Sequence, residues 1–458
     1  MTKSDLRISV LSSRAPIRFG SGSAPSVEHV GGLTRVLPAL AEFAHINWFA
    51  FASDGQGSIP GNYSYSEIAH QVLRNEIDIS LVKVNVESLN LGDWLCATIL
   101  WPLLHDLEIP KIGAAKLDSS LAAIAESSSA LAHASVESEA SGFFVNDFQL
   151  SQVPLTLRAS GKLEPITFFL HTPWPKTMPS SPTTLKLLKF LATGMLAANV
   201  IEFQTKHDLL GFQEFTARYF SLEATGALLR VNPVSVDYSR LQNLAQVKDL
   251  VTSLERNDIS FVHIARSDPV KNTAAVIDAF TQVFQARIQS GYRIYLDLFI
   301  VPSRQQWPEY QHLFNEILRQ VEVANEELSI HQKDAIRLRI GNDHQNAVRA
   351  LTRYDYLLVC SVADGLNLVV KEGAILNQRN GVIISTPKVG AMAELGDFCV
   401  IARDSSEANI VAAIKCAMNL DPAIRVSMSQ KLRNQVKEYD LSHWARSVVA
   451  NFDLKGQA

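Results

Sequence analysis

Residues 354–373 read YDYLLVCSVADGLNLVVKEG and carry the clearest fold signal in the chain. The run of apolar, aromatic and β-branched residues at 356–361 predicts a buried strand. A tight loop at 363–365 follows, and an apolar pattern with the helical period begins near Asn367. A strand, a loop and a helix in this order form the unit of a parallel α/β sheet, whose loops lie at the carboxyl ends of the strands.

The start of this helix is a predicted anion site. A helix that begins at such a loop directs unpaired backbone N–H groups and the positive end of its dipole toward a ligand. Lys371 follows Asn367 by four residues and shares its helix face, while Glu372 has a carboxylate that can accept hydrogen bonds from a ribose. The stretch therefore predicts a site for a nucleotide or a sugar diphosphate.

Length and composition indicate a globular protein with two domains. The chain has 458 residues, more than one hydrophobic core usually holds, and its hydrophobic content is 47%. Its net charge of −4 arises from 42 basic and 46 acidic residues that form no long runs. This pattern lacks the electrostatic footprint of a protein that binds nucleic acid or an anionic membrane, so we expect neither partner.

The cysteines and the amino terminus predict a reducing, cytoplasmic location. Four cysteines are present without C-x-x-C spacing, so neither a metal site nor a disulfide framework is expected. The first residues, MTKSDLRISVLSSR, lead into a strand pattern without an apolar signal segment, and no apolar run is long enough to span a bilayer.

Strand and helix patterns alternate through both halves of the chain and predict an α/β fold. The segment NPVSVD at 232–237 is the predicted link, because the alternation restarts after it. We expect Rossmann-like domains at 1–235 and 236–440, and a C-terminal helix within 441–458 that packs back on the N-terminal domain. The expected architecture is two doubly wound domains facing a central cleft.

Charged and polar residues recur at the predicted strand ends. They are Arg14, Asp147, His171, Arg266, Lys271, Arg304, Asp364 and Glu372. A surface charge, a helix cap or a turn explains each one alone, but their joint placement at the edge of a parallel sheet indicates a ligand site. Arg266 and Lys271 share one strand-to-helix loop and can clamp a diphosphate. Arg14 and Arg304 are candidates to neutralise a second anion.

A glycine-rich loop, FGSGSAPSVEHVGG at 19–32, precedes a predicted helix. Gly31 and Gly32 allow the backbone to approach a phosphate or a sugar closely. Pro25 stands where the third glycine of G-x-G-x-x-G belongs, so the loop is not a dinucleotide fingerprint. A flexible surface turn is the alternative interpretation.

The order of several short blocks resembles a known family. The blocks are SSR at 12–14, GGL at 31–33, LWP at 100–102, NDFQL at 146–150, FFLHTPWP at 168–175, LLGFQ at 209–213, ARSDPVKN at 265–272, PSR at 302–304 and ADGLNLVVKEGA at 363–374. They are similar to blocks of the trehalose-6-phosphate synthase family, glycosyltransferase family 20. The resemblance runs from about residue 7 to residue 444 and implies the two-domain GT-B fold, with an acceptor-side N-terminal domain and a C-terminal domain that binds the nucleotide sugar.

The resemblance implies a donor site made largely by the C-terminal domain. Arg266 and Lys271 would bind the donor's diphosphate, and Glu372 would bind the ribose of the nucleotide. The residues that would hold the donor sugar and its phosphates are Asp364, Gly365, Leu366, Asn367 and Leu368, with Gly31 and Gly32 against the phosphates.

The resemblance also implies an acceptor site and a catalytic set. His171 would contact the donor sugar near the reacting centre, and Asp147 would contact the acceptor. The residues that would bind the acceptor's phosphate are Arg14, Trp101 and Arg304. The predicted catalytic set is His171, Asp147, Arg266 and Lys271.

Some blocks depart from the family pattern. Gln149 replaces the second His of HDYH, Ala363 replaces the Arg before Asp-Gly, and 269–272 read PVKN where the family has YSKG. Gly92 or Asp93 stands where a Tyr helps to bind the acceptor's phosphate. Several of these departures resemble the validoxylamine 7′-phosphate synthase branch, a pseudo-glycosyltransferase that couples a nucleotide-activated cyclitol to an aminocyclitol phosphate.

The main functional hypothesis is a retaining glycosyltransferase that moves a glycosyl group from a nucleotide diphosphate sugar to a phosphorylated sugar such as glucose 6-phosphate. One alternative is the pseudo-glycosyltransferase, and another is a non-catalytic paralogue that binds a sugar phosphate. The expected partners are the nucleotide sugar and the sugar or cyclitol phosphate, and a homo-oligomer is left open. No cofactor or metal is expected, because the protein's cations and a helix N-terminus can stabilise the leaving phosphate.

Overall fold

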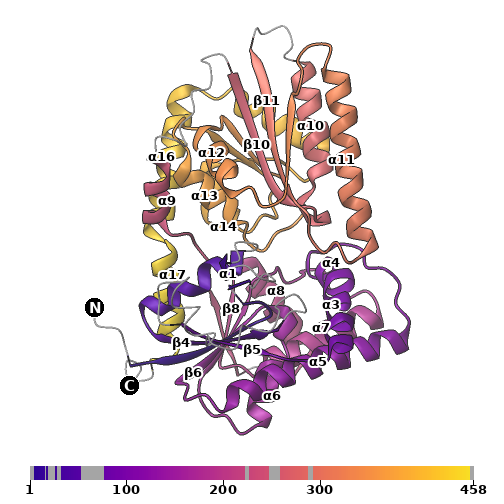
Figure 1. The fold of residues 1–458 in the computed structure, drawn as a ribbon, viewed down its shortest axis with the longest axis vertical. Coiled ribbons are helices and arrows are strands. Elements are labelled where there is room, and N and C mark those ends of the chain that lie inside the picture. Colours follow the sequence, from indigo (N-terminus) through magenta and orange to yellow (C-terminus); the bar gives the residue numbers. More distant parts are fainter. Residues whose placement is uncertain are drawn as a thin grey trace. The chain divides into compact units, whose positions relative to one another are not determined.

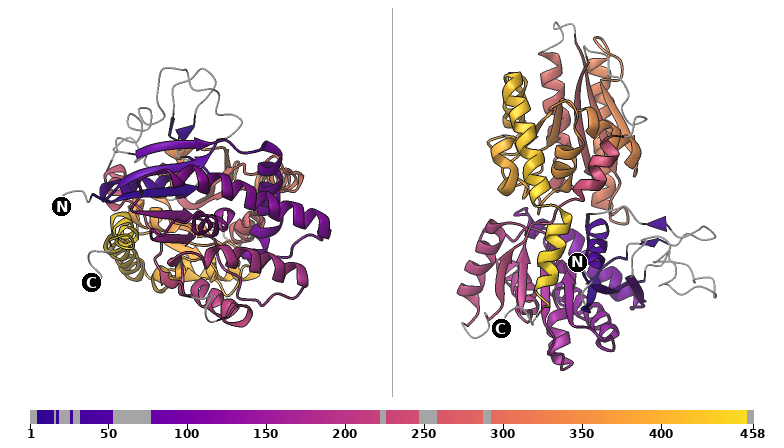
Figure 2. Two further views of the ribbon diagram at one scale, coloured as in Figure 1. Left: turned by 90° about the horizontal axis from the view of Figure 1, so that it is seen from below. Right: turned by 90° about the vertical axis from the view of Figure 1, so that its left-hand side faces the viewer.

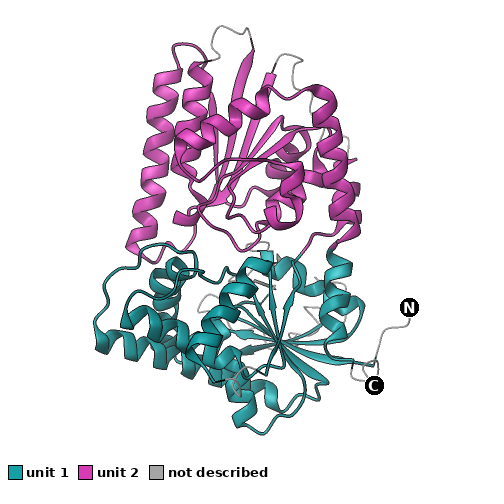
Figure 3. Cartoon of the chain, turned by 180° about the vertical axis from the view of Figure 1, so that it is seen from behind, with its two compact units in different colours: residues 1–234, 441–458 teal, residues 235–440 magenta. Residues whose placement is uncertain are grey.

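The computed structural model describes residues 5–15, 17–18, 26–27, 32–52, 77–221, 226–246, 258–286 and 292–453. The chain divides into two units, which Figure 3 shows in different colours. Unit 1 comprises residues 1–234 and 441–458, and unit 2 comprises residues 235–440. Each unit is built around its own parallel sheet with its own hydrophobic core.

The sheet of unit 1 has seven parallel strands in the order β5-β4-β1-β6-β7-β8-β9. They are β1 (Arg7–Ser12), β4 (His45–Phe51), β5 (Ile77–Val82), β6 (Gly142–Asn146), β7 (Ile166–Leu170), β8 (Val200–Phe203) and β9 (Leu228–Val231). Every residue of β6 and β7 is buried, as expected for strands whose two faces are both covered by helices. A separate antiparallel pair joins β2 (Ile17–Arg18) to β3 (Ser26–Val27).

Three helices of unit 1 begin at a residue whose side chain caps the first turn. Asn85 accepts hydrogen bonds at the start of α3, Ser181 forms a capping box at α7, and Thr205 caps α8. The helices are α1 (Gly32–Val36), α3 (Val86–Leu95), α4 (Trp101–Leu104), α5 (Ala114–Val136), α6 (Val153–Ala159), α7 (Pro182–Met195), α8 (Lys206–Tyr219) and α17 (Leu441–Ala450). Further helical segments are the 3-10 segments Leu37–Glu42 and Phe148–Leu150 and the π segment Cys96–Leu100.

The sheet of unit 2 has six parallel strands in the order β12-β11-β10-β13-β14-β15. They are β10 (Asp258–Arg266), β11 (Arg293–Val301), β12 (Ile336–Ile340), β13 (Tyr356–Val359), β14 (Val382–Ser385) and β15 (Val400–Ile401). The predicted strand of the stretch 354–373 is β13, which pairs with β10 and β14. It therefore lies inside the sheet, which explains its uninterrupted apolar sequence.

Helices cover both sides of the unit 2 sheet. Figure 1 shows α10 and α11 on one side of β10 and β11, and α12 and α13 on the other. The helices are α9 (Tyr238–Ala245), α10 (Thr273–Gln285), α11 (Pro308–Leu328), α12 (His344–Arg353), α13 (Leu368–Leu376), α14 (Met392–Leu395), α15 (Glu407–Met418) and α16 (Pro422–Glu438). The 3-10 turns Pro269–Lys271 and Gly396–Phe398 complete the unit.

The last helix, α17, belongs to unit 1 although the chain reaches it from unit 2. Figures 1 and 2 show this yellow helix against the indigo and magenta elements of unit 1. Trp444 is 1% exposed, and its ring lies 6.4 Å from that of Phe144 and 6.1 Å from that of Phe169. Asn451 donates from Nδ2 to Oε1 of the buried Glu202 at 2.8 Å. Among the residues described, no helix is both long and apolar enough to cross a membrane.

Trp444→Ala is expected to lower the free energy of unfolding of unit 1 by about 3–5 kcal/mol, because it removes a buried aromatic side chain. Urea denaturation followed by circular dichroism measures the change. Leu163→Ala is the matched control in the same unit, since Leu163 is 90% exposed. It should alter stability by no more than about 0.5 kcal/mol. Equal effects of the two substitutions would contradict the docking of α17.

Candidate active site

Lys271 and Asp364 lie together in unit 2, although 93 positions separate them in the sequence. Lys271 ends the 3-10 turn after β10, and Asp364 follows β13, the neighbour of β10 in the sheet. Their side chains form an ion pair. Asp364 Oδ2 also accepts hydrogen bonds from Ser361 Oγ at 3.2 Å and from Asn367 Nδ2 at 2.9 Å. The structure thus brings together two of the residues predicted at the donor's phosphates.

A second loop, residues 388–391, holds the backbone of the loop after β13. Gly390 N donates to Asp364 O at 3.0 Å, and Ala391 N donates to Leu366 O at 2.9 Å. A Cβ on Gly390 would lie 1.8 Å from Gly365 O, so only glycine permits this approach. The two loops therefore pack backbone against backbone at the carboxyl edge of the sheet.

The helix α13 begins at Leu368, as the sequence predicts. Its N-cap residue, Asn367, has φ +72° and makes no side-chain hydrogen bond to the first turn. The Asn367 side chain instead donates to Asp364. The first N–H groups of an α-helix have no partner within the helix, so this end favours an anion.

Lys371 and Glu372, which are neighbours on α13, have different environments. Lys371 is 1% exposed, and its Nζ lies 3.1 Å from Oε1 and from Oε2 of Glu394 on α14. Burial lowers the pKa of Lys371, and the Glu394 carboxylate opposes that shift. Glu372 is half-buried. Lys371 therefore joins α13 to α14, and Glu372 is the more accessible of the two.

Arg266 and Arg304 both approach the carboxylate of Asp268. Arg266 is the last residue of β10, and Arg304 follows β11 with φ +52°. Asp268 Oδ2 lies 2.9 Å from Arg304 Nη1 and 3.6 Å from Arg266 Nη2. The resemblance assigns these arginines to different phosphates, and Asp268 is not among the predicted site residues. The available signal was an Asp directly before Pro269, which is a frequent arrangement at a helix start.

His171 follows β7 in unit 1 and has a partner at each ring nitrogen. Its Nε2 lies 3.1 Å from Asn146 Oδ1, and its Nδ1 lies 3.4 Å from Gln204 Nε2. The Asn146 amide nitrogen donates to Leu11 O, and the Gln204 amide oxygen accepts from Val234 N. These bonds assign the proton to Nε2 and make Nδ1 an acceptor.

Burial lowers the pKa of His171 to about 3, so its imidazole is neutral at physiological pH. The ring also stacks on Phe169, with a centroid distance of 4.2 Å. A neutral imidazole fixed on three sides suits the positioning of a sugar better than proton transfer. Asn146 and Gln204 were not among the predicted site residues.

Asp147 adjoins His171 at the ends of β6 and β7. Its backbone N–H donates to Phe169 O at 2.8 Å, and its Oδ1 accepts a hydrogen bond from Thr172 Oγ1 at 3.4 Å. Burial raises the pKa of Asp147 to about 6, and hydrogen bonds from the backbone of Phe148, Thr172 and His171 oppose the shift. Its backbone has φ +71°. Asp147 therefore changes its ionisation near pH 6.

The remaining predicted residues lie around the same edge of unit 1. Arg14 is exposed just after β1, where its carbonyl accepts from Ser12 Oγ at 2.7 Å. The Trp101 ring on α4 lies 6.4 Å from that of Phe148, the residue after Asp147. Gly32 is the exposed first residue of α1, and Gly31 lies outside the described residues.

Unusual backbone conformations concentrate at these loops. Seven non-glycine residues of the described chain have positive φ. Four of them lie in the strand-end loops of the candidate site: Asp147, Asn272, Arg304 and Asn367. Such conformations cost free energy and persist where the surroundings hold them, which is typical of functional sites.

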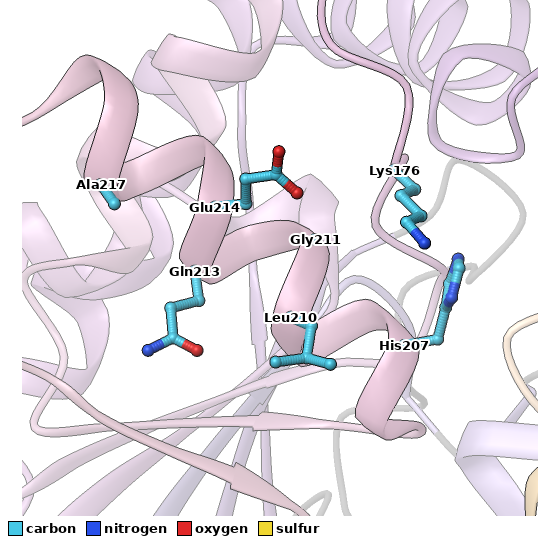
Figure 4. A pocket seen from close by; sticks show the side chains of 7 residues that line it. All are labelled: Lys176, His207, Leu210, Gly211, Gln213, Glu214 and Ala217. Atoms are coloured by element: carbon cyan, nitrogen blue, oxygen red, sulfur yellow. The ribbon is translucent and has the colours of Figure 1, made fainter.

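An open hollow of about 550 Å³ lies beside α8 and contains none of the predicted residues. Figure 4 shows Leu210, Gln213, Glu214 and Ala217 on successive turns of α8 along it. Lys176 and His207 also line this hollow. Within the part of the chain that the structure describes, no group of three His, Cys, Asp or Glu side chains could hold a metal ion.

Two α/β units, each built on a parallel sheet, are the architecture expected of a GT-B protein, and the cations of the candidate site gather in unit 2. Residues 7–453 match the family model of glycosyltransferase family 20, and the chain belongs to this family. The fold and the family predicted from the sequence are thereby confirmed. The trehalose-phosphate synthase (UDP-forming) from Burkholderia xenovorans, solved in complex with glucose-6-phosphate, has a TM-score of 0.80. It is 18% identical, and the match covers 97% of this chain and 99% of that one.

Curated relatives come from both branches that the sequence motifs suggest. Validamine 7-phosphate valienyltransferase of Streptomyces hygroscopicus subsp. jinggangensis is 25% identical over 331 residues, or 69% of this chain and 66% of that protein. Trehalose-6-phosphate synthase of Mycobacterium sp. (strain KMS) is 25% identical over 477 residues, which cover 96% of this chain and 94% of that protein. Sequence identity is the same for the valienyltransferase and the synthase, but the match to the synthase spans more of both chains.

Proposed function

We propose that this protein transfers a glycosyl group from a UDP sugar to a phosphorylated hexose such as glucose 6-phosphate. The observation that carries the proposal is the gathering of Arg266, Lys271 and Arg304 at the end of β10 and in the loops after β10 and β11 of unit 2. Three cations there suit a diphosphate and a further phosphate. Membership of glycosyltransferase family 20 and the relatives named for trehalose-6-phosphate synthesis support the choice of substrates.

The reaction retains the configuration of the anomeric carbon by a front-face route. The acceptor hydroxyl attacks the anomeric carbon as the bond to the donor phosphate breaks, and its proton passes to the departing phosphate oxygen. Arg266, Lys271 and the N-terminus of α13 stabilise the charge that develops on the leaving diphosphate. His171 orients the donor sugar as a neutral group, and Asp147 orients the acceptor hydroxyl. These groups supply the stabilisation without a metal.

A second candidate is coupling of a nucleotide-activated cyclitol to an aminocyclitol phosphate. The valienyltransferase of Streptomyces hygroscopicus supports it, together with Gln149 and the PVKN segment at 269–272. The match to that relative spans 331 residues, whereas the match to the mycobacterial synthase spans 477. Because the match to the synthase is longer, we rank sugar transfer above cyclitol coupling.

An assay of UDP release tests the function directly. UDP-glucose with glucose 6-phosphate should give turnover that EDTA leaves unchanged. The activated cyclitol with its aminocyclitol phosphate, offered in parallel, should give less than a tenth of that rate. Faster cyclitol coupling would establish the second candidate. Stabilisation by UDP and glucose 6-phosphate without turnover of either pair would identify a non-catalytic binding protein.

Arg266→Ala should reduce kcat/KM by the equivalent of about 2–4 kcal/mol, because a leaving group loses one preorganised cation. Initial rates with UDP-glucose and glucose 6-phosphate measure the loss. Arg319→Ala is the matched control, since Arg319 lies on α11 with a 64% exposed side chain paired to Glu316. A turnover for Arg266→Ala within about threefold of the parent would refute the role assigned to this arginine.

Asp147→Asn should remove the decrease in kcat/KM that the Asp147 carboxyl group causes at acidic pH. The carboxylate accepts a hydrogen bond from the acceptor hydroxyl, whereas the neutral acid loses this capacity below its pKa of about 6. The ratio of kcat/KM between parent and variant should therefore be greatest above pH 7 and fall below pH 6. The sugar phosphate also ionises in this range, with a second pKa of about 6. Because it affects both proteins equally, the ratio of their kcat/KM values removes its contribution.

At pH 7, where Asp147→Asn should lower activity, the same substitution should raise the stability of the fold. Asp147 has a higher pKa in the folded state than its ordinary 3.8, so the unfolded chain loses this proton first as the pH rises. The stability contribution of the carboxyl group is therefore present below pH 4 and lost by about pH 6. Asp147→Asn should raise Tm at pH 7 and leave it unchanged at pH 4. A lower Tm at pH 7 would show that the carboxylate stabilises the fold.

A further inference from the structure

The loops after β10 and β11 meet at a single carboxylate, that of Asp268. Its side chain is fully buried, with 0% exposure. Oδ1 accepts a hydrogen bond from Val270 N at 3.2 Å, which caps the turn leading to Lys271. Oδ2 accepts from Arg304 Nη1 at 2.9 Å and lies 3.6 Å from Arg266 Nη2. One oxygen atom thus contacts two guanidinium groups, one from the end of β10 and one from the loop after β11.

The two loops are also joined through their serines. Ser303 N donates to Ser267 Oγ at 3.1 Å, and Ser303 Oγ donates to Ser267 O at 2.9 Å. The backbone ladder of β10 and β11 continues one step further, because Ser267 N donates to Val301 O at 2.9 Å. These bonds fix the backbone immediately before Asp268 and immediately before Arg304. The loops therefore act as one rigid support.

Arg304 is held in a conformation that its surroundings must stabilise. Its φ of +52° lies in the left-handed region, which is unfavourable for a long side chain. Nη1 donates to Asp268 Oδ2 at 2.9 Å and to the Tyr310 hydroxyl at 3.0 Å. A charge-assisted bond to a buried carboxylate is the strongest of these contacts. The placement of Arg304 thus depends on the charge of Asp268.

Solvent exposure differs between Asp268, which supports the two arginines, and the arginines themselves, which can contact a ligand. The side chains of Arg266 and Arg304 are 35% and 16% exposed, whereas that of Asp268 is inaccessible. Two guanidinium groups so close together repel one another, and the shared carboxylate offsets this repulsion. Lys271 is neutralised separately by Asp364. Asp268 therefore sets the positions of two of the three cations and leaves the third to another carboxylate.

We propose that Asp268 is a positioning residue that couples the donor's diphosphate site to the acceptor's phosphate site. It does so by holding Arg266, assigned to the diphosphate, and Arg304, assigned to the acceptor's phosphate, on one oxygen. The inference rests on the proposed function, which supplies these two assignments. Removal of the Asp268 charge releases both arginines together, so both substrates lose affinity. An Arg304 substitution also changes the contact between Asp268 and Arg266, so it affects binding of the nucleotide.

The test compares Asp268→Asn with the parent by calorimetric titration, well below Tm, with UDP and glucose 6-phosphate as separate ligands. Asn keeps the size of the side chain and an oxygen for Val270 N–H but removes the charge. Kd should rise at least about tenfold for each ligand, equivalent to about 1.4 kcal/mol. Asp421→Asn is the matched control: Asp421 caps α16 in the same unit by accepting from Ala423 N at 2.7 Å. It should leave both Kd values within about twofold, which is less than about 0.5 kcal/mol.

A second variant keeps the test decisive if Asp268→Asn does not fold. Arg304→Gln lies on the acceptor side, yet it should raise the Kd of UDP at least about threefold through Asp268 and Arg266. An unchanged Kd for UDP in this variant would overturn the coupling. For Asp268→Asn, weakening of only one ligand or of neither would do the same, as would a lower Tm with both Kd values unchanged. Failure of the parent protein to bind either ligand would instead refute the proposed function.

Discussion

Three cations gather at the carboxyl edge of the unit 2 sheet, and their arrangement depends on two carboxylates that form ion pairs with them. Asp268 is shared by Arg266 and Arg304, and Asp364 is paired with Lys271. A parallel sheet brings these residues together, because the carboxyl ends of all its strands lie at the same edge. Without internal counter-charges, the cations would repel one another before any phosphate arrived. The carboxylates hold the cations in place, and a bound phosphate then neutralises part of the positive charge that the carboxylates neutralise without it.

The candidate site residues of unit 1 include a group joined by neutral hydrogen bonds. Asn146 is the last residue of β6, and His171 and Gln204 follow the next two strands of the sheet, β7 and β8. The three side chains contact one another in that order. Burial keeps His171 uncharged and shifts the ionisation of Asp147 toward neutrality. Such a surface suits the hydroxyl groups of a sugar, whereas the charged edge of unit 2 suits phosphates. The chemistry of each unit matches a different part of the proposed substrates.

The loop after β13 shows how far reasoning from the sequence extends. The apolar run, the Asp-Gly pair and the helical period predict a strand and a helix start near Asn367, and α13 begins at Leu368. The sequence does not reveal that residues 388–391 hold this loop, or that Gly390 must be glycine. It also gives no sign that Lys371 turns to Glu394, because that contact joins different helices. Local pattern predicts the element, and contacts between distant segments determine its surroundings.

Within the candidate site, the contacts of Asp268 show the same division between what a local sequence pattern predicts and what contacts between distant segments determine. Arg266, Lys271 and Arg304 are recognisable as candidates because charged residues at strand ends have a simple chemical meaning. Their division between two carboxylates depends on which strands are neighbours and on the left-handed turn at Arg304. By itself the sequence determined the α/β class and the family, since local periodicity and motif order encode them, and it named the candidate site residues. Only the tertiary structure decided the ion pairs, the tautomer of His171 and the raised pKa of Asp147, because these depend on burial and on contacts across the sheet.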